Sequence, residues 1–281
     1  MEQVTGFIKK VISIITKPEM RVLPGQLAFF FVLSIVPLIA LIGAIAARFA
    51  IPLEAIDEYL LVALPGSVAE LFAGAVARDS INFNIVVFFV SAFLLASNGT
   101  HSMIITSNEI YKVKPGNILE RRLKAIGMTS LLLGVFLFLI LVPVCGDTFF
   151  EIIKETSNNQ GLVDFIYRVY QIIKYPISIL VVYLNIKVLY VIAPDKKIRS
   201  KTTTKGALFT TISWILATEI YTFYIGTFSS YDVFYGSISN IIILLLWIYI
   251  LSYIFVLGMA INAGNTTEED IERTGMLLTK K

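Results

Sequence analysis

The segment "IIILLLWIYILSYIFVLGMAINA" (241–263) decides the fold, because it contains 23 consecutive residues without a single charged side chain. A helix needs about 20 such residues to cross a hydrocarbon core ~30 Å thick. The whole chain has the same bias, since 57% of its 281 residues are hydrophobic and 15% are charged. Soluble domains carry about 25% charged residues. The sequence, with a mean hydropathy of +0.80, therefore predicts an integral membrane protein.

Five further apolar segments precede this one. They are too long for transmembrane strands and lack the alternation of polar and apolar residues that such strands show. Helices are the other structure that satisfies the backbone in lipid, so we expect an all-α fold. The predicted membrane domain covers 27–264, between an N-terminal segment (1–26) and a tail (265–281). The six predicted spans are about 27–48, 83–108, 125–146, 175–193, 206–228 and 236–262.

The positive charges predict the orientation of these spans. If both termini lie in the cytoplasm, the inner segments hold 17 Lys and Arg residues and the outer loops hold five. Cytoplasmic loops of membrane proteins carry an excess of Lys and Arg. We therefore expect a multi-pass membrane protein with both termini in the cytoplasm, which agrees with an even number of spans.

Two predicted outer loops are longer than simple connections. Both Ile51–Asp79 and Asp147–Lys174 have apolar residues at helical spacing, interrupted by turn residues. This pattern is typical of short amphipathic helices that lie on the membrane surface. The alternative interpretation is that they are ordinary helices capping the bundle.

A polar stripe interrupts the second predicted span. Ser97, His101 and Asn108 fall within roughly 40° of one another on a helix. Polar side chains at this depth avoid lipid and face other helices or a wet cavity. The stripe could hydrogen-bond neighbouring helices, at about 0.6 kcal/mol per bond, or line a path for a substrate or proton. His101, the single histidine, is the candidate for a titrating group because an unperturbed imidazole titrates near neutral pH.

Other polar groups inside the predicted spans extend this set. Glu219 lies about 13 residues from the inner end of the fifth span, so we expect it to face the bundle interior or an outer cavity. Pro37 and Pro143 predict breaks in the first and third spans, and broken helices often adjoin transport sites. The candidates for a substrate or proton path are Ser34, Ser97, His101, Asn108, Glu219 and Asn262.

Basic side chains gather in the two inner loops. Each can gain about 1 kcal/mol beside anionic headgroups. We therefore expect anionic phospholipids as partners, with association into homo-oligomers left open. The candidate lipid contacts are Arg121, Arg122, Lys196, Lys197 and Arg199.

The sequence offers no catalytic constellation. It has one histidine and one cysteine, Cys145, and no HExxH, GxSxG or Walker A pattern. We expect no catalytic residue, no metal site and no cofactor, and hence no enzyme. A net charge of +3 provides no broad basic field for nucleic acid.

Several motifs resemble the YihY/BrkB family over about residues 20–264. The first is "LAFFFVLSIVPLI" (27–39), followed by Asn108-x-x-Tyr111 with the basic Arg121-Arg122 pair, Tyr190-x-x-x-Pro194, and a last segment with Tyr235-Gly236, Trp247, Gly258 and Asn262. The chain departs from the family pattern at Lys205-Gly206-Ala207 and at Gly258-Met259-Ala260. The resemblance implies a six-helix inner-membrane protein from a family that was suggested to export lipids or small solutes and was earlier mislabelled as ribonuclease BN.

The predicted function is therefore transport or export of a lipid or small amphiphilic solute. The alternative is a non-transporting membrane scaffold or envelope-integrity factor, and a ribonuclease is disfavoured. A transporter needs a polar cavity beside the candidate residues. In a scaffold, the buried polar groups would be satisfied from helix to helix.

Overall fold

The computed structural model describes residues 11–48, 85–156, 160–228 and 239–264. Every regular element in these ranges is helical, which confirms the predicted all-α class. The long helices are α2 (Glu19–Arg48), α5 (Ile85–Tyr111), α6 (Ile118–Thr156), α7 (Gln160–Ile192), α8 (Thr204–Phe228) and α10 (Ser239–Ala263).

Four helices of the described chain are long and apolar enough to cross a membrane. The qualifying segments are Ile118–Leu139, Gly161–Ile192, Thr204–Ile225 and Ser239–Ala263. They overlap the third to sixth predicted spans, whose bounds stay a prediction. Spans in α2 and α5, and hence a total of six, stay a prediction.

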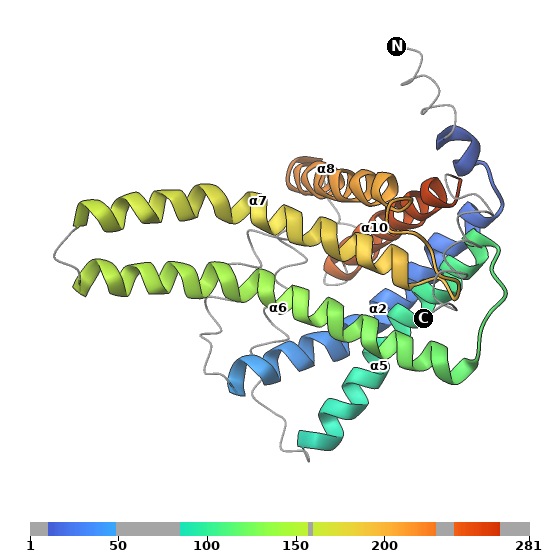
Figure 1. Ribbon diagram of the computed structural model, residues 1–281, viewed down its shortest axis with the longest axis horizontal. Coiled ribbons are helices and arrows are strands. Elements are labelled where there is room, and N and C mark those ends of the chain that lie inside the picture. Colours follow the sequence, from blue (N-terminus) through green and yellow to red (C-terminus); the bar gives the residue numbers. More distant parts are fainter. Residues whose placement is uncertain (1–10, 49–84, 157–159, 229–238, 265–281) are drawn as a thin grey trace, which may run out of the picture.

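The six helices form a closed ring. Each packs against two neighbours in the order α2, α5, α6, α7, α8, α10 and back to α2, and α5 also contacts α10 across the ring. Figure 1 shows α6 and α7 running side by side and projecting beyond the other helices. Because helices far apart in sequence close the ring, residues from both halves of the chain meet in its interior.

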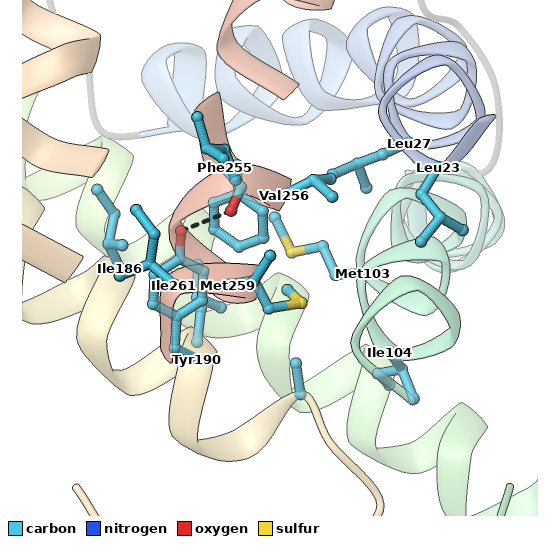
Figure 2. Close-up of a cluster of buried hydrophobic side chains, with 14 of the residues drawn as sticks. Leu23, Leu27, Met103, Ile104, Ile186, Tyr190, Phe255, Val256, Met259 and Ile261 are labelled. Carbon is cyan, nitrogen blue, oxygen red and sulfur yellow. Dashed lines mark hydrogen bonds between the residues drawn. The ribbon is translucent and has the colours of Figure 1, made fainter. Parts of the chain in front are cut away.

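The hydrophobic core is concentrated where α7 and α10 end. Tyr190, Phe255 and Met259 are completely buried there, and Leu27 and Met103 join them in one cluster. Figure 2 shows these side chains converging from four helices, with the Tyr190 hydroxyl directed at the Phe255 carbonyl. Every residue of α10 from 255 to 262 is buried, so this end of the helix is enclosed on all sides.

The helices α6 and α7 correct the prediction for the second outer loop. The segments 147–156 and 160–174 continue the two long helices instead of forming separate short ones. With 39 residues, α6 is about 58 Å long at 1.5 Å per residue, well beyond the ~30 Å hydrocarbon core. The loop 51–79 lies outside the described residues.

The predicted proline breaks are also wrong. The helical backbone runs without interruption through Pro37 in α2 and through Pro143 in α6, and α7 contains Pro176. Transmembrane helices tolerate proline because local backbone adjustments and neighbouring groups satisfy the freed carbonyl.

Local signals set the helix ends nearest to the core. At the end of α5, Lys112 adopts φ 54°, and the Val113 N–H donates to the Asn108 carbonyl at 2.8 Å, as in a Schellman cap. The next helix begins where the Asn117 side chain accepts the Leu119 N–H at 3.1 Å. Pro194 disfavours helical geometry in the residue before it, so α7 ends nearby. These signals place the short connecting loops at one end of the ring.

Candidate functional site

Asp195 ties together three separate segments at this end of the ring. Its side chain is 7% exposed, and Oδ1 lies 2.7 Å from the Lys124 Nζ at the start of α6. Its Oδ2 accepts hydrogen bonds from the Asn108 Nδ2 at 2.7 Å and the Gly116 N–H at 3.0 Å. The Asp195 N–H in turn donates to the Asn108 Oδ1 at 2.8 Å. We call Asn108, Gly116, Lys124 and Asp195 the Asp195 interlock.

The charges within the Asp195 interlock are balanced. Lys124 also donates to the Ala193 and Pro194 carbonyls at 3.1 and 2.9 Å, so three acceptors surround its ammonium group. Burial alone would raise the pKa of Asp195, but hydrogen bonds from Lys124, the Gly116 N–H and Asn108 outweigh it and hold the pKa below its usual value. The carboxylate is therefore charged at neutral pH and fully partnered, which is the arrangement of a structural lock.

A second polar contact joins α8 to α10. The Gly206 N–H, one of the unpaired donors in the first turn of α8, donates to the Asn262 Oδ1 at 2.7 Å. A Cβ atom on Gly206 would collide with the Gly258 carbonyl, so the two helices touch through their backbones. The hydroxyl of Tyr190 bonds both Thr210 Oγ1 and the Phe255 carbonyl, each at 2.7 Å.

The structure gathers the residues of the sequence motifs. The motif residues come from three helices and one loop, and all lie at the same end of the ring. They are Asn108, Tyr190, Pro194, Gly258 and Asn262. Asn108 and Asn262 were predicted to line a path, and each has a protein partner for its side-chain oxygen. Asp195 was missed, because an acid beside proline in a basic loop carries no sequence signal of burial.

Two more predicted path residues also have hydrogen-bond partners within the protein, and one of them joins α2 to α5. The Gly99 N–H donates to the Ser34 Oγ of α2 at 3.1 Å. Ser97 is fully buried and donates to the Leu94 carbonyl in its own helix at 2.7 Å. Beside them, the hydroxyls of Thr100 and Thr129 lie 2.8 Å apart and join α5 to α6.

Five other buried hydroxyls in the described part of the chain have no hydrogen-bond partner, that of Tyr111 at the end of α5 and four on Ser and Thr side chains. Ser102, Thr106 and Ser107 lie on α5, and Ser252 lies on α10. All four residues are at most 1% exposed. Leaving a buried hydroxyl unsatisfied costs about 1–3 kcal/mol. We call these four side chains the unpaired hydroxyls. The dense run of hydroxyl residues after Ser97 was the sequence signal that could have revealed three of them.

The last two predicted path residues lie apart from this interior. His101 is only partly buried and lies within electrostatic reach of Arg121 and Arg122. Glu219 is exposed, so it does not face the bundle interior, and the alternative of an outer cavity stays a prediction. It shares its face of α8 with Leu216 and Phe223, which are 55% and 64% exposed. The apolar composition of this helix on all sides left its rotation undefined in the sequence.

Three of the five predicted lipid contacts come together. Arg121, Lys196 and Lys197 line one cavity beside the Asp195 interlock. Arg122 instead donates to the Asn98 Oδ1 at 2.9 Å and the Leu94 carbonyl at 2.8 Å. Arg199 is exposed and does not line this cavity.

The apolar helical ring defines the class of the molecule as an integral membrane protein. The chain belongs to the family described as "Virulence factor BrkB", which it matches over residues 11–276. This confirms the resemblance carried by the sequence motifs.

Relatives from several bacteria match most of the chain. The ribonuclease-like protein YfkH of Bacillus subtilis (strain 168) is 31% identical over 92% of this chain and 94% of its own length. The UPF0761 membrane protein PSHAa0171 of Pseudoalteromonas translucida (strain TAC 125) is 25% identical over 98% of this chain and 90% of its own. A UPF0761 membrane protein of Chlorobium luteolum is 28% identical over 80% of this chain, which covers 52% of that relative. No solved structure matches.

Proposed function

We propose that the protein moves a lipid or small amphiphilic solute across the bacterial inner membrane. The observation that carries this proposal is the set of unpaired hydroxyls. Ser102, Thr106 and Ser107 of α5 and Ser252 of α10 are buried without partners, in two helices that contact each other across the ring.

The physical argument is that these hydroxyls need an acceptor or donor that the resting chain does not supply. A polar group of a passing solute would satisfy them and recover the cost of about 1–3 kcal/mol each. The same two helices contribute buried apolar side chains to the core, including Met103 and Val256, which are 2% and 0% exposed. A few hydroxyl groups among apolar side chains suit an amphiphilic molecule better than an ion.

The scaffold alternative is favoured by a different observation. The hydroxyl pairs Thr100–Thr129 and Tyr190–Thr210 are satisfied from helix to helix, as expected of a bundle that only holds its shape. We propose that these paired hydroxyls only stabilise the bundle of a protein that also transports. A bundle with a purely structural role would not need the unpaired hydroxyls.

Transport is tested with fluorescent phosphatidylglycerol, labelled at the headgroup or acyl chain, in vesicles that contain the purified protein. Dithionite added outside destroys only outward-facing fluorophores. We expect a second, slower loss of fluorescence that protein-free vesicles lack. The same loss with and without protein, both in the absence and in the presence of an imposed pH gradient, would overturn the proposal.

The proposed orientation has a separate test in a Cys145→Ala background. A cysteine at Ser200, which is exposed in the loop after α7, should react with an impermeant thiol reagent only after cells are opened. A cysteine at position 67 should react in intact cells. The opposite labelling pattern would place both termini outside.

A further inference from the structure

A groove of about 530 Å³ lies between the start of α6 and the loop after α7. Gly116 and Asn117 lie at one side, and Pro194 and Lys196 lie at the other. The Asp195 interlock forms part of its wall and fixes the two sides relative to each other. The groove is therefore built from parts that the fold holds rigidly.

The charge in this groove is mainly positive. Arg121, Lys124, Lys196 and Lys197 line it together with two acids, Glu120 and Asp195. Asp195 is already committed to Lys124 at 2.7 Å, with Arg121 at 3.9 Å. Lys196 and Lys197 are exposed, and no ion pair within the described residues involves either of them. Two ammonium groups are thus available to an anion.

The other wall of the groove is apolar. Val191, Ile192 and Ile198 line it. Near the start of α6, Ile118 and Leu123 are 75% and 61% exposed, as expected for side chains in contact with lipid. A ligand that fills this site needs an anionic head and an apolar body.

We propose that the groove binds the phosphate of an anionic phospholipid, with the headgroup beside Lys196 and Lys197 and the acyl chains along Ile192. This inference rests on the proposed function in one respect, because it makes the groove the inner access point for the transported lipid. Binding itself does not require that the lipid crosses.

Native mass spectrometry of the purified full chain with added phosphatidylglycerol tests the site. The double variant Lys196→Gln/Lys197→Gln removes both available charges at exposed positions, so folding should be preserved. The matched control, Lys201→Gln/Lys205→Gln, removes two exposed charges outside the groove, one from the same loop and one from the first turn of α8. A loss of about fivefold per lysine, roughly 30-fold for the pair, is expected for the first variant only.

The outcomes separate the possible ligands. Equal weakening in both double variants, or none in either, would overturn the site. Phosphatidylcholine should bind equally well to wild type and variant. Inorganic phosphate should not displace phosphatidylglycerol, and displacement at millimolar phosphate would instead assign the groove to a soluble anion.

The vesicle assay separates this site from transport. If only the Lys196→Gln/Lys197→Gln variant loses lipid binding but the wild-type protein translocates no lipid, the binding site stands and the proposed function is rejected. If that variant loses lipid binding but translocates lipid at the wild-type rate, transport stands and the groove is rejected as its access point.

Discussion

One helix carries two polar regions of opposite character. At the end of α5, Asn108 exchanges two hydrogen bonds with Asp195. Less than two turns earlier, Ser102, Thr106 and Ser107 are equally buried and have no partner. The difference separates polar groups that hold the bundle together from polar groups that are left ready for something else.

The physical basis of this difference is the cost of burial. A buried polar group without a partner costs about 1–3 kcal/mol, whereas a well-partnered one is nearly neutral or modestly favourable. Removing a group from the first region should therefore destabilise the protein. Removing a hydroxyl from the second should leave its stability unchanged or raise it.

The largest effect is expected at Asp195. Asp195→Ala leaves the Lys124 ammonium half-buried without its carboxylate and should cost about 3–5 kcal/mol, as for other broken buried ion pairs. Thermal unfolding of the detergent-solubilised protein measures this loss. Glu109→Gln removes an exposed acid next to Asn108 at the end of α5 and should change little. Similar midpoints for the two variants would contradict the structural role of the Asp195 interlock.

The same carboxylate predicts a dependence of stability on pH. Its pKa is lowered from the ordinary 3.8, so its contribution is complete above that value and is lost as the pH falls through the lower pKa of the folded state. Between pH 5 and 8, Asp195 should therefore give no slope. The wild type should lose more stability below about pH 4 than Asp195→Asn does, as measured by unfolding midpoints. If the midpoints of both proteins fell equally with decreasing pH, Asp195 would not be a charged, partnered carboxylate.

A smaller loss is expected where α8 touches α10. Gly206→Ala places a methyl group against the Gly258 carbonyl, and overpacking of this kind costs about 1–3 kcal/mol. Gly134→Ala is the matched control, because a Cβ there meets nothing within 4 Å and alanine favours the helix. The unfolding midpoint should fall for the first variant only. A stable Gly206→Ala protein would show that the helices do not approach through their backbones.

A still smaller effect distinguishes paired from unpaired hydroxyls. Thr100→Val removes a hydroxyl that is hydrogen-bonded to the Thr129 hydroxyl and to the Ser97 and Ala125 carbonyls, and it should cost about 1 kcal/mol. Thr106→Val removes a hydroxyl that has no partner and should cost nothing. Both changes replace a hydroxyl by a methyl group in the same helix, so a difference in unfolding midpoint measures what the hydrogen bonds of the Thr100 hydroxyl contribute. Equal midpoints would erase the distinction between the two regions.

The smallest effect is expected at Glu219. Because this acid is exposed among apolar side chains on α8, Glu219→Gln should leave the rate of lipid translocation unchanged in the vesicle assay. A strongly reduced rate at normal protein content would return Glu219 to the transport path.

Sequence reasoning succeeded where long apolar runs determine structure. It predicted α-helices along the chain and identified Asn108 and Asn262 as unusual buried polar groups. It could not identify Asp195, because the burial of that acid depends on Lys124 and Asn108, which lie 71 and 87 positions away. It could not decide whether Glu219 faces the bundle interior, because a helix that is apolar all round gives no preferred direction. Sequence reasoning also did not predict the long hairpin of α6 and α7. The apolar residues there keep helical spacing beyond the length that a membrane requires, so the spacing does not show where one helix ends and another begins.

The central claim is that the unpaired hydroxyls serve transport and not stability. The most direct measurement is translocation of fluorescent phosphatidylglycerol by the triple variant Ser102→Ala/Thr106→Val/Ser107→Ala, in vesicles matched to wild type for protein content. The account predicts a rate close to that of protein-free vesicles, together with an unfolding midpoint equal to or above that of the wild type. A wild-type rate, or a slow rate accompanied by a lowered midpoint, would contradict it.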